Sequence, residues 1–279
     1  MAGIIIVAVF ACAGWAMQMS GYPHGAPCWF ELETSDHRGG QAFWSQLFGW
    51  ACDDFPMPGS ASVYTMFALG GDAHVAAVYA LDPAIAAQGS VPHWNVYFRV
   101  LDCDSATARA LAAGGRVLAG PFDVGTHGRM SYLADPEGAA FGLWQPYEHQ
   151  GAGRIHEDGA VGWVELAARD TARAGEFYRA VLGWDVSEME MPHGLYRLFA
   201  AGGTQWGGLL GMTEEWGEMP AHWSIYWRVA NVDAAVAKAK ALGGTQCFPS
   251  FDAPGVGRIG RVNDAQGVGA YLIEFPQGR

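Results

Sequence analysis

The 279-residue chain has few charged residues and few basic ones. Charged residues make up 16% of it, and 16 Lys and Arg stand against 28 Asp and Glu, for a formal charge of −12. Binding to nucleic acid depends on a basic surface that neutralises phosphates, so this composition argues against a nucleic-acid partner. No Lys/Arg cluster or basic amphipathic segment is present either, which argues against a membrane surface as a partner.

Cysteine is also sparse and shows no pairing pattern. The five cysteines are scattered and form no Cys-x-x-Cys pair: Cys12, Cys28, Cys52, Cys103 and Cys247. This odd set argues against a disulfide framework and against a thiolate metal site. Buried free thiols in a reducing compartment are the better interpretation, so we expect a cytoplasmic protein.

No Lys or Arg precedes Arg38, although the chain opens with an apolar run, AGIIIVAVFACAGWAM at residues 2–17. A membrane span needs about 20 such residues, and a secretory signal needs a positively charged start. We therefore interpret residues 1–18 as an apolar extension. An upstream misread start, with Met17 or Met19 opening the protein, is favoured over a signal-like segment.

What the chain does contain is a long internal repeat. The segments HWNVYFRV (93–100) and HWSIYWRV (222–229) are nearly the same, and other pairs follow in the same order. They are WFELETSD (29–36) with WVELAARD (163–170), FWSQLFGW (43–50) with FYRAVLGW (177–184), YTMFALGG (64–71) with YRLFAAGG (196–203), and DPEGAAFGLWQ (135–145) with DAQGVGAYLIE (264–274). The offset changes from 163 − 29 = 134 to 222 − 93 = 129. We expect two domains, 24–148 and 161–277, joined by a polar, glycine-rich linker at 149–160.

Each copy of the repeat divides again into two similar halves. In the first copy, the alternating pattern of WFELETSD predicts a strand, and an apolar-periodic helix follows and ends at a glycine. The order then restarts with NVYFRVLD. The predicted helices are 39–48 and 105–113, and the predicted strands after them are 63–69 and 73–80, then 129–134 and 139–145. The pattern is βαβββ twice in each copy, which predicts an α+β fold.

The ordered set of strand-Asp-helix, LFGW or VLGW, a second strand-Asp-helix and GR…DPEG resembles the vicinal oxygen chelate superfamily. This superfamily holds the glyoxalases, the bleomycin-resistance proteins and the extradiol dioxygenases, and the PCW…EL opening and GLWQ ending resemble its tandem-domain actinobacterial members. The resemblance covers about residues 24–277. It implies two tandem domains, each made of paired βαβββ units whose mixed sheet forms a cup for a small-molecule ligand. Two domains in one chain also make a monomer plausible beside a homodimer.

The resemblance also implies positions for metal ligands, and these positions hold unsuitable residues. Relatives place His, Gln or Glu seven residues before the Asp that ends the first and fifth strands, and Glu seven residues after the Asp of the DPxG turn. The corresponding residues here are Trp29, Trp163, Asn95, Ser224, Gly142 and Tyr271. Indole and glycine offer no metal-binding side-chain atom, and amides and hydroxyls are poor ligands for first-row metals. We therefore predict neither a metal nor another cofactor.

Alternation along the strands indicates which side chains face into each cup. If Trp29 and Asn95 point inward, then Glu31, Tyr97 and Arg99 do so as well. The corresponding residues of the second copy are Trp163, Ser224, Glu165, Tyr226 and Arg228. A buried carboxylate needs a partner. We expect Arg99 and Arg228 to pair with the glutamates, with Arg129 and Arg258 as the next candidates.

These residues favour a metal-independent protein that binds a small aromatic or polar organic molecule, as in sequestration or resistance. The alternative is a metal-free lyase, isomerase or cyclase acting on a compound of secondary metabolism. A metal-dependent glyoxalase or dioxygenase is the second alternative. In an enzyme, Glu31 or Glu165 would accept a proton and Tyr97 or Tyr226 would donate one, with His93 as a further catalytic candidate. The predicted ligand-binding residues are Trp29, Tyr64, Asn95, Arg99, Arg129, Trp144, Trp163, Ser224, Arg228, Arg258 and Tyr271.

Overall fold

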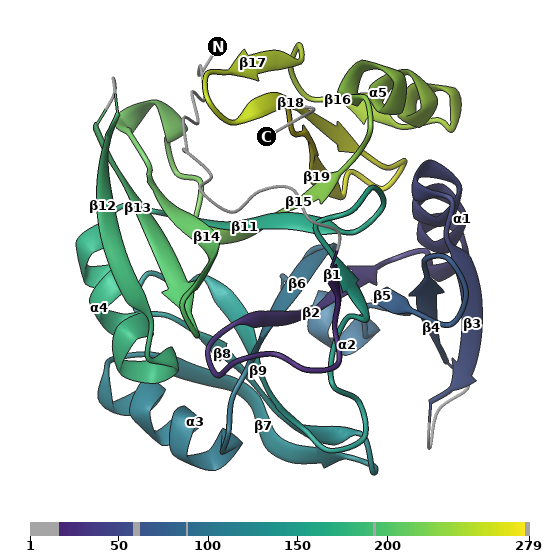
Figure 1. Ribbon diagram of the computed structural model, residues 1–279. Helices are drawn as coiled ribbons and strands as arrows, with labels where there is room; N and C mark the ends of the chain where they lie inside the picture. The colour runs from purple at the N-terminus through teal and green to yellow at the C-terminus, as the bar shows by residue number, and fades with distance from the viewer. Residues whose placement is uncertain (1–16, 58–61, 88, 192–193, 277–279) are drawn as a thin grey trace.

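The computed structural model describes residues 17–276, apart from 58–61, 88 and 192–193. It contains two large mixed sheets, one from each half of the chain, and helices that lie between and beside them (Figure 1). The prediction of two tandem α+β domains built from paired βαβββ units is confirmed. The predicted extension lies almost wholly outside the described residues. Its last two residues form β1 (Met17–Gln18), which pairs with β10 (Arg154–Ile155) of the predicted linker.

The elements of each domain follow the same order. In the first domain they are β2 (Pro27–Thr34), α1 (His37–Phe48), β3 (Ala51–Pro56), β4 (Val63–Ala68), β5 (His74–Ala80), α2 (Pro83–Ala86), β6 (His93–Arg99), α3 (Cys103–Ala112), β7 (Arg116–Val124), β8 (Gly128–Ala134) and β9 (Ala140–Pro146). In the second they are β11 (Val161–Ala168), α4 (Thr171–Leu182), β12 (Asp185–Met191), β13 (Gly194–Ala201), β14 (Thr204–Gly211), η1 (Glu214–Trp216), β15 (His222–Arg228), α5 (Val232–Ala241), β16 (Thr245–Gln246), β17 (Phe251–Ala253), β18 (Gly257–Asn263) and β19 (Gly269–Glu274).

The first strands of the two half-repeats lie at the centre of each sheet. The strand order is β3-β4-β5-β2-β6-β9-β8-β7 in the first domain and β12-β13-β14-β11-β15-β19-β18-β16 in the second, where β17 also pairs with β18. Strands β2 and β6 run antiparallel to each other, and each runs parallel to the last strand of its own half. The strands at the sheet edges, β3 and β7, were not assigned from the sequence, because they are mostly exposed and show no clear alternation of apolar and polar residues.

The strand-Asp-helix motif begins each of the four long helices with a capping side chain. Asp36, Asp102 and Asp170 accept hydrogen bonds from backbone amides in the first turns of α1, α3 and α4, and Asn231 does the same for α5. Such caps satisfy amides that have no partner inside the helix. Gly49 ends α1 in the left-handed region at φ 75°, a conformation that glycine adopts without steric cost.

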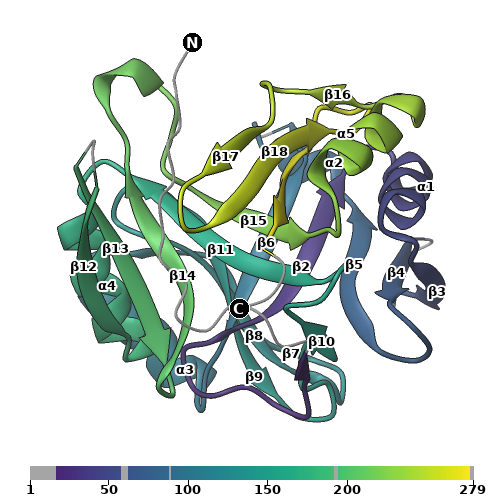
Figure 2. The same cartoon turned by 45° about the horizontal axis from the view of Figure 1, so that its top comes forward.

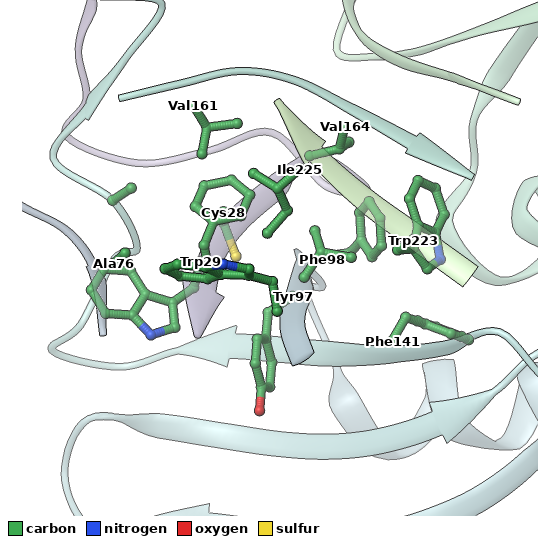
Figure 3. Packing of buried hydrophobic residues seen from close by; sticks show 14 of the residues in the cluster. Cys28, Trp29, Ala76, Tyr97, Phe98, Phe141, Val161, Val164, Trp223 and Ile225 are labelled. Carbon is green, nitrogen blue, oxygen red and sulfur yellow. The ribbon is translucent and has the colours of Figure 1, made fainter. Parts of the chain in front are cut away.

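The two domains pack against each other through the outer faces of their sheets. On β6, Phe98 lies 5.1 Å from Trp223 of β15, and Trp94 lies 5.1 Å from Trp227, measured between ring centroids. Figure 3 shows Phe98 beside Trp223 and Ile225, while its neighbour Tyr97 points to the opposite side. Helix α1 contacts α5 and α3 contacts α4, so one helix pair flanks the aromatic layer on each side (Figures 1 and 2). One large hydrophobic cluster therefore joins both halves of the chain, and a smaller second cluster lies within the second domain.

Reciprocal hydrogen bonds from the LFGW and VLGW motifs hold this arrangement. Trp50 Nε1 donates to the carbonyl of Gly159 in the second domain, and Trp184 Nε1 donates to the carbonyl of Gly25 in the first, both at 2.7 Å. Each of these glycines lies just before the first strand of its domain. The tryptophan at the end of one helix therefore fixes where the other domain begins.

The DPEG and DAQG turns make a second reciprocal set. The Glu137 carboxylate accepts hydrogen bonds from the backbone amides of Arg169 and Asp170 at 2.7 and 2.8 Å, at the start of α4. The Gln266 side-chain oxygen accepts from the amide of Asp36 at 2.7 Å, at the start of α1. The turns that identify the repeat therefore join the two domains.

Among the described residues, no helix is long and apolar enough to cross a membrane. The four described cysteines are unpaired, as expected, but only Cys28 and Cys103 are buried, whereas Cys52 and Cys247 are exposed. The expectation that the cysteines are buried thiols is therefore correct for two of these four.

Replacing Trp184 by Phe tests the reciprocal hydrogen bonds. Trp184 is 1% exposed and stacks on Phe199 with a centroid distance of 3.8 Å. The substitution removes the hydrogen bond to Gly25 and some buried volume, so we expect the free energy of unfolding to fall by about 2–4 kcal/mol. Urea denaturation should show one cooperative transition. Trp216→Phe, a change at a partly exposed site on η1, is the control; an equal effect there would contradict this role for Trp184.

Candidate functional site

The faces of the two sheets that point away from the domain interface carry the polar side chains. On β2 these are Trp29, Glu31 and Glu33, and the antiparallel register places Trp29 opposite Tyr97 and Glu31 opposite Asn95 on β6. We call this surface of the first sheet the first inner face, and its equivalent around Trp163 and Glu165 the second inner face. The alternation along β2 and β6 therefore brings together the residues selected from the sequence.

Glu31 lies at the centre of the first inner face and accepts hydrogen bonds from its aromatic neighbours. The Tyr64 hydroxyl donates to its Oε1 at 2.6 Å, and Trp29 Nε1 lies 3.2 Å from the same oxygen. Trp29 Nε1 also donates to the Tyr64 hydroxyl at 2.9 Å. Removal of the carboxylate from water raises the pKa of Glu31, and the hydrogen bonds from Tyr64, Tyr97 and Trp29 oppose that rise only in part. A protonated Glu31 can donate a hydrogen bond as well as accept one.

A second polar group lies beside this cluster on the same face. Tyr132 donates to the side-chain oxygen of Asn95, and Asn95 Nδ2 donates to the Tyr79 hydroxyl at 3.3 Å. His93 Nε2 lies 3.2 Å from the Tyr132 hydroxyl, and His93 Nδ1 lies 3.9 Å from Glu33. His93 is therefore linked to Glu33 and Tyr132 rather than to Glu31.

Aromatic rings close one end of the first inner face. The His149 ring lies edge-on to Trp29 at a centroid distance of 4.3 Å, and Trp144 Nε1 donates to the His149 carbonyl at 2.8 Å. Burial lowers the pKa of His149 to about 4, so its ring is neutral at pH 7. The buried Nε2 atom of His149 has no hydrogen-bond partner within the described residues. This end of the face is therefore built from closely packed aromatic rings, and its unpartnered polar atom is buried among the described residues.

The second inner face repeats the glutamate cluster in a buried form. Glu165 accepts hydrogen bonds from the hydroxyls of Tyr196 and Tyr226, both at 2.8 Å, and Trp163 Nε1 donates to Tyr196 at 3.1 Å. Glu165 and Tyr196 are only 3% and 1% exposed, whereas their counterparts Glu31 and Tyr64 are partly exposed. Burial raises the pKa of Glu165 to about 7.

One position of the cluster differs between the two domains. In the first domain Tyr97 is opposite Gly142, where a Cβ atom would lie 2.0 Å from the tyrosine ring. In the second domain Tyr226 is opposite Tyr271, and the two rings stack with a centroid distance of 4.4 Å. The Tyr271 ring therefore fills space on the second inner face. The adjacent Ser224, the counterpart of Asn95, stays partly exposed.

The expected pairing of the glutamates with Arg99 and Arg228 is wrong. Arg228 lies 3.3 Å from Asp158 and donates to the carbonyl of His156. Arg99 forms no ion pair within the described residues. The antiparallel register explains the error. Asn95 is opposite Glu31 and Phe98 is opposite Pro27, the first residue of β2, so Arg99 lies beyond the start of that strand and away from Glu31.

The second pair of arginines lies on the other side of the sheets. Arg129 binds Asp104 of α3 at 2.7 Å and Asp123 at 3.1 Å. Arg258 binds Asp233 of α5 at 2.9 Å and Asp252 at 3.0 Å. Along β8, Arg129 alternates with Tyr132 and Met130, so it faces the helix rather than Glu31. Tyrosine hydroxyls, not guanidinium groups, are the partners of both glutamates.

The described residues do not fit a metal ion of the kind that the superfamily uses. No group of three or more His, Cys, Asp or Glu side chains in the described ranges lies close enough to hold one. The positions implied by the resemblance present indole, amide, hydroxyl and glycine, and Glu31 and Glu165 are occupied by phenol hydrogen bonds. No chemical step is therefore assigned to a metal.

Several residues of the inner faces were not selected from the sequence. Tyr196 could have been, because it aligns with Tyr64 in the repeated YTMFALGG and YRLFAAGG segments. Tyr79 and Tyr132 lie on strands whose alternation was not followed. His149 was assigned to the linker, and only the path of the chain brings it against Trp29.

The raised pKa of Glu165 predicts a pH-dependent stability. The unfolded chain releases this proton near the ordinary pKa of 4.5, whereas the folded protein holds it up to about pH 7. The unfolded state thus binds fewer protons in this window, and the contribution of Glu165 falls by about 3 kcal/mol as pH rises from 4.5 to 7. Glu165→Gln should lose this dependence, so the variant should gain stability relative to the parent as pH rises in urea denaturation. Glu176→Gln on the exposed face of α4 is the control; a parallel pH profile for both variants and the parent would contradict the prediction.

Comparisons with known proteins agree with this architecture. Residues 29–144 and 163–270 each match the glyoxalase-like domain family. A Mycobacterium tuberculosis (strain CDC 1551 / Oshkosh) protein named putative glyoxylase CFP32 is 41% identical over 260 residues, which cover 92% of this chain and 98% of that protein. The Streptomyces peucetius anthracycline biosynthesis protein DnrV is 34% identical over 272 residues, covering 93% of this chain and 97% of that protein.

Solved structures show the same fold at low sequence identity. The Mn(II)-bound glyoxalase of Novosphingobium aromaticivorans superimposes with a TM-score of 0.62 at 14% identity, covering 91% of this chain and 85% of that one. The 2,3-dioxygenase LapB of Pseudomonas sp. KL28 gives a TM-score of 0.63 at 12% identity, covering 92% and 97%. With both halves matched and relatives aligned over nearly their whole length, this chain belongs to the glyoxalase-like domain family of the vicinal oxygen chelate superfamily.

Proposed function

We propose that the first inner face binds a small, planar, oxygen-bearing aromatic molecule without the help of a metal. The observation that carries this proposal is the Glu31–Tyr64–Tyr97 cluster, in which Glu31 and Tyr64 are partly exposed and Tyr97 is buried. Its carboxyl group has a raised pKa and lies beside Trp29 and the other rings of that face. Flat apolar walls with a few convergent polar groups suit such ligands. The relatives named for anthracycline biosynthesis support the same class of ligand.

The second inner face serves as a scaffold in this proposal. It carries the same glutamate and tyrosines, but Tyr271 and the surrounding apolar side chains leave Glu165 only 3% exposed. The two faces therefore provide a matched pair of sites within one chain. Equivalent substitutions in the two domains should have different effects on binding.

A titration with a dihydroxyanthraquinone, followed by the quenching of tryptophan fluorescence, tests the proposal. Tyr64→Phe removes one hydroxyl from the first inner face and leaves Glu31 short of a partner, so the dissociation constant should rise about tenfold. Tyr196→Phe, the same change on the second face, should leave it within about twofold. A larger loss from Tyr196→Phe, or no saturable quenching by the parent protein, would overturn the assignment.

A metal-free enzyme is the second candidate, since a carboxyl group with a raised pKa beside two phenols is a general acid–base set. Glu31→Gln separates the two functions, because the amide keeps the hydrogen bonds but cannot exchange a proton. Lost turnover with retained affinity favours a lyase, isomerase or cyclase, whereas a change in affinity alone favours a binding protein. A stoichiometric divalent ion found by elemental analysis, removed together with activity, would instead support the metal-dependent alternative.

A further inference from the structure

A cavity of about 280 Å³ lies between the domains, away from both inner faces. It is formed where the last turn of α4 meets the side of α3, and Arg109, Arg179, His24 and Asp102 line it together with the chain around Val181. None of these side chains belongs to an inner face. The cavity is therefore separate from the site proposed above.

The two arginines of this cavity have no carboxylate partner among the described residues. Arg179 forms neither an ion pair nor a side-chain hydrogen bond there, and Arg109 uses only one nitrogen, Nη2, to donate to the Val181 carbonyl at 2.9 Å. By contrast, Arg129 and Arg258 each bind two carboxylates. Unpaired guanidinium groups in a chain with a formal charge of −12 are available for an external anion.

The cavity has two further polar side chains, Asp102 and His24. The Asp102 carboxylate is already used, because Oδ1 accepts from the Ser105 amide at 2.9 Å and Oδ2 from the Ser105 hydroxyl at 3.0 Å. The buried Nδ1 atom of His24 has no partner within the described residues. Burial is the main cause that lowers the pKa of His24, and the nearby charges of Arg109 and Arg99 lower it further.

The equivalent place at the other end of the interface has one basic residue instead of two. The repeat aligns Arg179 with Ser45, Arg109 with Lys238, and His24 with Asp158. Asp158 lies 3.3 Å from Arg228. The pair of arginines is thus present at only one of the two places that the repeat makes equivalent. The packing of the domains alone therefore does not account for it.

We propose that the cavity between α3 and α4 binds a small oxyanion of the phosphate type, held by the guanidinium groups of Arg109 and Arg179. Guanidinium groups match phosphate oxygens with two parallel hydrogen bonds, and these charge-assisted bonds are stronger than neutral ones. The His24 ring supplies a further donor. Because the ligand would touch α3 of one domain and α4 of the other, its binding would also stabilise the interface between them.

Titration of the full chain with inorganic phosphate, at constant ionic strength set with sodium chloride, tests this proposal. We expect one saturable site with a dissociation constant of about 1 mM or below, together with a rise in melting temperature. NMR should show the His24 imidazole pKa moving upward as phosphate binds, since a nearby anion stabilises the charged ring. These changes should be absent when sodium chloride is added in place of phosphate. An equal response to chloride would mean that the effect is ionic screening, and it would contradict the proposed site.

Matched variants locate the site. Arg179→Gln should raise the dissociation constant for phosphate at least tenfold and abolish the shift of His24. Arg173→Gln, on the exposed surface of the same helix and outside the cavity, should leave it within twofold. Arg179 is exposed and unpartnered in the described structure, so the variant should fold, as thermal melting in the absence of phosphate would verify. Unchanged phosphate binding in Arg179→Gln, or an equal loss in Arg173→Gln, would overturn the proposal.

Discussion

The contact between the outer faces of β6 and β15 is the constraint on which the rest of the structure depends. Phe98, Trp223 and Trp227 meet there, and the paired helices extend the same apolar layer. Burial of this aromatic surface favours a back-to-back arrangement of the sheets. It also leaves the opposite side of each sheet free to carry polar groups, and that is where both glutamate clusters lie.

The two inner faces show how one chemical arrangement can have two roles. Each has a glutamate between two tyrosines and a tryptophan, and burial raises the pKa of both carboxyl groups. On the first face the cluster is partly open and continues into Asn95 and Tyr132. On the second, a tyrosine replaces a glycine and stacks on Tyr226, and the cluster is buried. The two domains therefore repeat the same glutamate, tyrosine and tryptophan side chains, but solvent reaches the cluster only on the first face.

Sequence patterns predicted the fold and part of the candidate site for identifiable physical reasons. The side-chain alternation of strands placed Trp29, Glu31 and Tyr97 on one face, because it depends only on neighbouring residues. It could not identify the partners of Glu31, which depend on the register between strands and on the order of strands in the sheet. That is why Tyr64 was predicted only as a ligand-binding residue and not as a hydrogen-bond donor to Glu31, and why Arg99 was wrongly paired. His149 could not be found, because its position follows from the path of a connecting segment.

The reciprocal hydrogen bonds of Trp50 and Trp184 restrict how such a chain can diverge. Each half carries the tryptophan that positions the start of the other half. A change in either tryptophan therefore affects both domains. The hydrogen bonds described for the glutamate clusters of the inner faces each stay within one domain. Sequence differences between the two copies are therefore better tolerated on the inner faces than at the interface between the domains. One domain can thus acquire a binding role while the other retains a structural one.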